Sequence, residues 1–135
     1  MYILTYLFVR GIFDESLAIA MNSMGQTNPP FMSGVPELLL LRLLEQQEMY
    51  GYELVRSIRT VTSDAISLGE GVIYPVLHGL EKAGALKARR KAVSGRTRVY
   101  YSLTSKGQKR LDRLQGEWQR IESGIKAAFD APSHA

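Results

Sequence analysis

The side chains with the most evident chemistry are the basic residues between Lys82 and Arg113. This block holds eleven lysines and arginines and a single acid, Asp112, whereas residues 1–81 hold four basic and nine acidic side chains. The whole chain of 135 residues has a net charge of only +4, so its positive charge is concentrated in one region. A block of this density is typical of a surface that binds a polyanion, and the alternative is a basic surface that stays in water.

The remaining composition argues against catalytic and metal chemistry. The chain has no cysteine, and its two histidines, His78 and His134, are far apart. A disulfide framework, a thiolate zinc site and an iron–sulfur cluster are therefore excluded, and no motif brings a nucleophile, a base and an orienting group together. We predict no enzyme activity, no metal and no cofactor. The absence of cysteine also suits a reducing compartment, which favours a cytoplasmic location.

Three helices are predicted ahead of the basic block. A wide leucine stripe predicts a helix over about 33–47 that is buried on more than one side, and a second helix is expected over 51–62. A third opens at Ser67 and Glu70, which have the spacing of a capping box, and ends at Gly84, a natural left-handed C-cap. The apolar repeat of the second helix consists of Leu54, Val55, Ile58 and Val61.

A basic hairpin is expected after the third helix. Residues 86–90 and 97–104 alternate in polarity, and Ser94-Gly95 is a turn signal between them. On the second strand the core face is expected to hold Tyr101, which leaves Tyr100 on the opposite face. The cations that the hairpin projects around its tip are Arg89, Arg90, Lys91, Arg96 and Arg98. Such a loop must either stay in water or meet anions.

The last element is a long helix over 105–129, for which Thr104 is the expected cap. Its apolar residues recur at steps of three and four, which is the spacing of a coiled-coil seam. The seam is short for a coiled coil standing alone, so the helix packs either on its own domain or against a second copy of the chain. The seam positions that we assign to dimerisation are Leu111, Leu114, Trp118, Ile121 and Ile125.

These elements predict an α+β, mainly α fold: a winged helix-turn-helix with an added C-terminal dimerisation helix. We expect an N-terminal extension over 1–32 (an extra helix or a mobile segment), a winged-helix domain over 33–104, the dimerisation helix over 105–129 and a tail over 130–135. The apolar run at 2–9 is far too short to cross a bilayer, so no membrane association is expected.

Three motifs, in the same order along the chain, resemble the PadR family of transcriptional regulators. Tyr50–Leu54 reads Y-G-Y-E-L, like the family's signature. Glu70–Gly84 resembles the family's E-G-T-L-Y-P-x-L-H-R-L-E-x-x-G stretch, and Gly95–Gly107 resembles its G-R-x-R-x-Y-Y-x-L-T-x-x-G wing. The resemblance covers about residues 35–129, nearly the whole chain beyond its N-terminal segment.

The resemblance implies a homodimeric winged-helix transcription factor, usually a repressor, of the subgroup with a short C-terminal helix. With the basic hairpin, it predicts binding to double-stranded DNA at a palindromic operator, with the third helix in the major groove and the hairpin at the phosphates. Val72 and Gly79 stand where the family often has threonine and arginine, so the operator need not match that of relatives. The expected DNA-binding residues are Ser67, Glu70, Gly71, Val72, Tyr74, Pro75, His78, Arg89, Arg90, Lys91, Arg96, Arg98 and Tyr100.

The sequence leaves two alternatives open for the role of each of two residues, and it leaves two open for the function of the protein. Tyr74 either bonds a phosphate or braces the hairpin. Trp118 either packs at the dimer contact or, as the resemblance to drug-sensing relatives implies, stacks on a small aromatic effector. The alternative function is a winged-helix protein-interaction module that docks an acidic protein and has no specific DNA binding.

Overall fold

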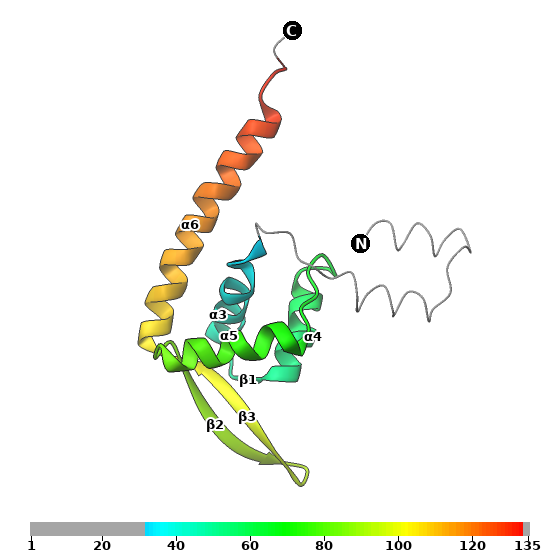
Figure 1. Ribbon diagram of the computed structural model, residues 1–135, viewed down its shortest axis with the longest axis vertical. Helices are drawn as coiled ribbons and strands as arrows, with labels where there is room; N and C mark the ends of the chain where they lie inside the picture. The colour runs from blue at the N-terminus through cyan, green and yellow to red at the C-terminus, as the bar shows by residue number, and fades with distance from the viewer. Residues whose placement is uncertain (1–31, 134–135) are drawn as a thin grey trace, which may run out of the picture. The chain divides into compact units, whose positions relative to one another are not determined.

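The computed structural model describes residues 32–133, so the expectations for residues 1–31 and for His134 lie outside the described residues. The helices are α3 (Val35–Gln46), α4 (Gly51–Val61), α5 (Glu70–Lys82) and α6 (Ser105–Asp130), and the strands are β1 (Met49–Tyr50), β2 (Leu86–Val93) and β3 (Arg96–Leu103). Figure 1 shows α3, α4 and α5 grouped above the hairpin β2–β3, with α6 extending away from them. The expected α+β, mainly helical winged-helix class is confirmed.

Helix α3 supplies the centre of the core. Leu40, Leu41, Leu43 and Leu44 are all buried, and α3 packs against α4, α5, β3 and α6. Burial on several sides is what the wide leucine stripe predicts, because a helix at the edge of a domain needs only one apolar face. The structure confirms that expectation.

The sheet has three antiparallel strands in the order β1-β3-β2. The turn between β2 and β3 consists of Ser94 and Gly95, whose φ angles of 51° and 78° are both positive. Such a two-residue turn matches the twist of the strands that it joins. Strand β1 is missing from the sequence-based interpretation, which has only a break there; Met49 and Tyr50 pair with Tyr101 and Tyr100 of β3.

Two expectations for the helix-turn-helix are wrong. The cap of α5 is Gly69 rather than Ser67, and it makes no side-chain capping bond. Leu68 is 1% exposed, so the chain must enter the core just before α5 begins, and this leaves Ser67 outside the helix. Val61, predicted on the apolar face of α4, is 59% exposed.

The start of α6 is fixed tightly to the rest of the domain. Thr104 is its cap, as expected: the Thr104 hydroxyl accepts from the Gly107 N–H at 3.0 Å and donates to the Gly84 carbonyl at 2.6 Å. A Cβ on Gly107 would lie 2.1 Å from the Ala85 carbonyl oxygen, so only glycine allows this approach. No helix in the part of the chain that the structure describes has both the length and the apolar character to span a membrane.

Candidate nucleic-acid interface

Helix α5 has one buried face and one open face. Ile73, Leu77 and Leu80 are buried and hold the helix on the core. The open face presents Glu70, Gly71, Val72, Pro75, His78 and Gly79, and Glu81 and Lys82 are exposed at the C-terminal end of the helix. A Cβ added to Gly71 or Gly79 would meet no atom within 4 Å, so the two glycines leave free space on this face. The N-terminal part of this face therefore has few large and few charged side chains, so another molecule can approach the helix closely.

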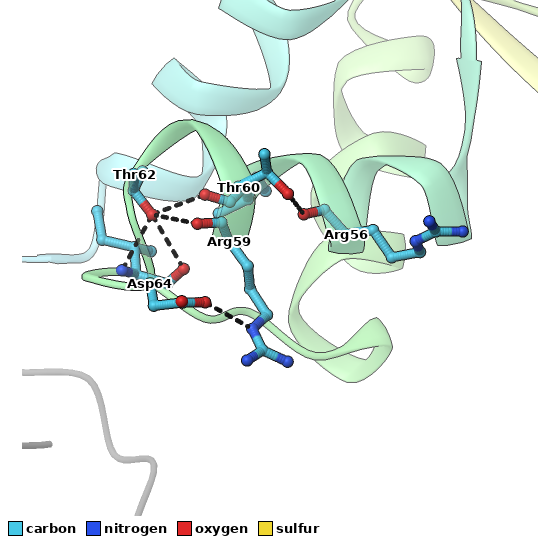
Figure 2. Close-up of polar contacts among 7 residues, drawn as sticks. Arg56, Arg59, Thr60, Thr62 and Asp64 are labelled. Carbon is cyan, nitrogen blue, oxygen red and sulfur yellow. Dashed lines mark hydrogen bonds and ion pairs between the residues drawn. The ribbon is translucent and has the colours of Figure 1, made fainter. Parts of the chain in front are cut away.

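The connection between α4 and α5 is a compact turn held by Thr62. The Thr62 hydroxyl donates to the Ile58 carbonyl, at 2.6 Å, and accepts from the Ile66 N–H, at 3.1 Å. Figure 2 shows Thr62 at the centre of several of these contacts. Ser63 and Asp64 have φ angles of 51° and 63°, which reverse the chain direction. Arg59 and Asp64 form an exposed ion pair at 3.4 Å across this turn.

Tyr74 braces the start of α4. A Cβ on Gly51 would lie 2.4 Å from the Tyr74 hydroxyl oxygen, so the tyrosine ring occupies the space that a larger residue would need. Gly51 is required for this close approach. Tyr74 is half-buried, and its ring centroid lies 6.1 Å from that of the exposed His78.

The wing, which we define as β2, β3 and their turn, has two chemically different faces. Directly opposite residues of antiparallel strands point to the same face, and the register pairs Arg89 with Tyr100 and Lys91 with Arg98. Arg90 pairs with Val99 and therefore points to the other face. The outer face of the sheet carries Lys87, Arg89, Lys91, Arg96, Arg98, Tyr50 and Tyr100. The sequence-based interpretation grouped Arg90 with these cations, and the register separates it.

The core-facing side of the wing is anchored by Tyr101. Tyr101 is 3% exposed, and Val99 and Leu103 pack beside it, as the alternation of β3 predicts. Burial raises the pKa of the Tyr101 hydroxyl, with a smaller contribution from the nearby Glu81 carboxylate. The wing is thus attached through one face, while its other face is turned to solvent.

The cations of the outer face have two kinds of close partner, a carboxylate and a tyrosine ring. Arg89 forms an ion pair with the Glu48 carboxylate. The Arg98 guanidinium lies over the Tyr50 ring, 4.4 Å from its centroid, and the Lys91 ammonium lies 5.1 Å from the centroid of Tyr100. Among the described residues, Arg89 is the only wing arginine with a carboxylate partner. Sequence reasoning missed the role of Glu48, because its partner lies 41 residues away.

The predicted dimer seam on α6 has two parts, one that packs against the core of its own domain and one that is exposed. Leu111 is 1% exposed and belongs to the core of its own domain, and Leu114 packs partly against that core. Beyond Leu114, every described residue of α6 is exposed. The large apolar side chains there, which we call the distal stripe, are Trp118, Ile121, Ile125 and Phe129, exposed by 44%, 44%, 53% and 85%. Phe129 was not among the predicted seam positions.

Comparison with known proteins identifies the family. The model described as the transcriptional regulator PadR-like family matches residues 40–113, just over half of the chain. The chain belongs to the PadR-like family. This is a family of transcriptional regulators and not of enzymes, so both the resemblance seen in the sequence and the expectation of a non-enzyme are confirmed.

Individual relatives agree with this PadR-like assignment. The chain is 34% identical to the uncharacterised protein X of Lysinibacillus sphaericus over 88 residues, which are 64% of this chain and 81% of that protein. It is 30% identical to the transcriptional regulator YqjI of Escherichia coli K12 over 97 residues, 72% of this chain but only 45% of YqjI. A PadR-like transcriptional regulator from Bacillus cereus has a similar structure, with a TM-score of 0.67 and 28% identity, over 77% of this chain and all of that one.

Proposed function

We propose that this PadR-like regulator is a homodimeric transcriptional repressor that binds a palindromic operator in double-stranded DNA. The observation that carries the proposal is that one domain combines an open α5 face, with few large side chains, and a wing whose outer face is densely cationic. A helix of this kind fits the major groove, and a cationic hairpin beside it supplies phosphate contacts. DNA as the partner also favours a cytoplasmic location.

In this proposal the two elements have separate roles. The exposed residues of α5 between Glu70 and His78 meet base edges, and the methyl groups of Val72 suit a thymine methyl. Ser67 lies in the turn before α5, near the phosphates that flank the groove. Wing cations provide affinity that depends on salt but not on sequence. The proposed phosphate contacts are the outer-face cations Arg89, Lys91, Arg96 and Arg98, with Tyr100 beside them, and Arg90, which is exposed on the opposite face of the wing.

The distal stripe supports the homodimer. Four large apolar side chains stand exposed on one side of α6, at the three- and four-residue spacing of a helix seam. Exposed apolar rows of this kind mark an interaction surface, and a second copy of α6 offers a matching one. Two copies joined there would place two α5 helices on one duplex.

Trp118 is the proposed effector site. The indole is 44% exposed and belongs to the distal stripe, so two copies would bring two indoles near each other. A flat aromatic compound could stack on such a pair and change the separation of the two α5 helices. We expect planar hydrophobic compounds to quench or shift Trp118 fluorescence and to release DNA. An unchanged spectrum at saturating ligand would contradict an effector site at this position.

The proposed function is tested by selecting bound fragments from a random duplex library at physiological salt. The expected result is a palindromic consensus whose half-sites lie about one helical turn apart. Retention of every sequence alike, or of none, would contradict sequence-specific binding. Binding to an acidic protein without any preference for duplex DNA would instead favour a protein-interaction module.

A further inference from the structure

Tyr50 opens the Y-G-Y-E-L motif, and the proposed function leaves it without a role. The residue lies in β1, directly before α4, and pairs with Tyr100 of β3. Its backbone N–H donates to the Glu53 carboxylate at 3.2 Å, which closes the first turn of α4. The backbone of Tyr50 is therefore fixed from two sides, and its ring projects onto the outer face of the sheet.

Two aromatic rings and two cations meet on that face. The rings of Tyr50 and Tyr100 contact edge to face, with centroids 5.5 Å apart and an interplanar angle of 66°. Arg98 lies over the first ring, at 4.4 Å, and Lys91 over the second, at 5.1 Å. Arg98 is thereby linked through Tyr50 of β1 to the helical core.

The surroundings of Arg98 differ from those of Arg89 in one respect that matters for an anion. A carboxylate neutralises Arg89, whereas a tyrosine ring leaves the charge of Arg98 intact. A guanidinium stacked on a ring keeps its N–H edges free and has less conformational freedom to lose on binding. Arg98 is therefore held ready for a phosphate, in a way that Arg89 is not.

We propose that Tyr50 is a positioning residue for DNA binding, which holds the Arg98 guanidinium on the outer face of the wing for a phosphate contact. The inference rests on the proposed function, because it needs a duplex that the wild-type protein binds. Tyr50 itself touches no DNA in this account and acts only through Arg98.

A double-mutant cycle tests the inference on the duplex obtained by selection. Tyr50→Leu is expected to weaken binding about two- to fivefold, the value of an exposed cation–π contact, while Tyr50→Phe keeps the ring and the affinity. In an Arg98→Gln background, Tyr50→Leu should have no further effect. Tyr52→Leu is the matched control: Tyr52 is a tyrosine two residues away, on α4, and it is 50% exposed, but its ring receives Arg56 of the same helix. We expect no coupling between Tyr52→Leu and Arg98→Gln.

Three results would overturn the inference. These are an unchanged affinity for Tyr50→Leu, an equal loss in both backgrounds, or an Arg98→Gln variant that binds as tightly as wild type. A wild-type protein that binds no duplex would instead contradict the proposed function, so the two failures are distinguishable.

A second variant keeps the inference testable if Tyr50→Leu does not fold. Arg98→Lys preserves the charge but loses the flat stack, so it should bind about two- to fivefold more weakly than the matched change Arg96→Lys. Arg96 is the right comparison because it is exposed on the same face of the same strand. Equal effects of the two lysine substitutions would overturn the role of Tyr50.

Discussion

The wing and the distal part of α6 both extend beyond the helical core (Figure 1). They expose opposite chemistry. The outer face of the wing is cationic, with tyrosine rings beneath the charges, whereas the distal stripe is apolar from Trp118 to Phe129. A cationic surface is satisfied by water or by anions, but an apolar row is stabilised only by another apolar surface. This contrast supports the proposal that the wing contacts a nucleic acid and that the distal stripe contacts a second protomer.

The two projections meet at the start of α6. Strand β3 ends at Leu103, Thr104 caps the helix, and Gly107 packs against the Ala85 carbonyl at the beginning of the wing. Two ties join α6 to α3: Gln108 donates to the Glu45 carboxylate at 2.6 Å, and Arg110 pairs with Glu37. The direction of α6 relative to the wing is therefore set by a rigid junction rather than by a free linker.

The largest expected effect comes from placing a charge in the distal stripe. Ile125→Glu would bring an unpaired carboxylate from each protomer into the interface, which costs about 3 kcal/mol or more and weakens dimerisation over a hundredfold. Sedimentation equilibrium measures the dimer constant. Ala127→Glu adds the same charge half a turn away on α6 and should leave the dimer intact. Equal dimer constants for the two variants would contradict the assignment of the distal stripe to the dimer interface.

The next largest effect is expected for a substitution at the junction between the wing and α6. Gly107→Ala forces a Cβ to 2.1 Å from a backbone oxygen, so we expect a loss of about 3 kcal/mol of unfolding free energy, at the upper end for overpacking. Gly116→Ala, on the same helix with nothing within 4 Å, should instead gain about 0.5–1 kcal/mol. Denaturant unfolding of both variants measures the two free energies, and a shared sign would contradict the tight junction.

The third effect comes from the removal of a single positive charge from the wing. Arg96→Ala should weaken binding to every duplex about fivefold at physiological salt and lower the log–log salt slope by about one, because one phosphate contact is lost. Lys109→Ala removes the same charge from α6 and should leave the slope unchanged. Salt titrations of DNA affinity provide the measurement, and identical slopes for the two variants would place the DNA somewhere other than the wing.

The smallest effect concerns the tie between α3 and α6. The Gln108 hydrogen bond, and then that from Arg42, hold the pKa of the Glu45 carboxyl below its ordinary value. A carboxylate of this kind stabilises the fold above its unfolded pKa, and the contribution disappears as the pH falls through the folded pKa. Gln108→Leu should therefore unfold slightly more easily than wild type at pH 7, with the difference vanishing in acid. A difference that is constant with pH would show that Glu45 is not involved.

Local signals explain why much of the fold could be predicted. Positive-φ turns favour residues such as Ser94-Gly95, and a threonine before a helix start, as at Thr104, is a strong cap. The three- and four-residue spacing located α4, α5 and α6, because each of these helices except the distal part of α6 buries one face on the core. The alternation of β3 likewise placed Tyr101 in the core.

The features that the sequence did not predict correctly are those that long-range contacts determine. Strand β1 has two residues, too few for any periodicity, and forms only because β3 offers a partner edge. The spacing of Ser67 and Glu70 is that of a capping box, but burial of Leu68 moves the helix start to Glu70. Heptad spacing cannot tell which molecule covers a residue, so Leu111 was assigned to the seam although its own domain buries it.

The candidate site was predictable in composition but not in arrangement. The sequence located the cations of the wing, yet only the strand register separates Arg90 from Arg89 and Lys91. It also gave no sign that Glu48 neutralises one cation or that Tyr50 stacks under another, because both partners come from the segment before α4. Side-chain partners across a sheet depend on register, which a single strand pattern does not determine.

The central claim, that a dimer places one α5 helix in each of two successive major grooves, is tested most directly by the spacing of the half-sites. Five base pairs inserted between the half-sites of the selected operator turn one of them to the far side of the duplex, since a helical turn is about 10 base pairs. Measured by titration, the affinity is predicted to fall to that for an unrelated duplex of equal length. An affinity that survives the insertion would contradict the account.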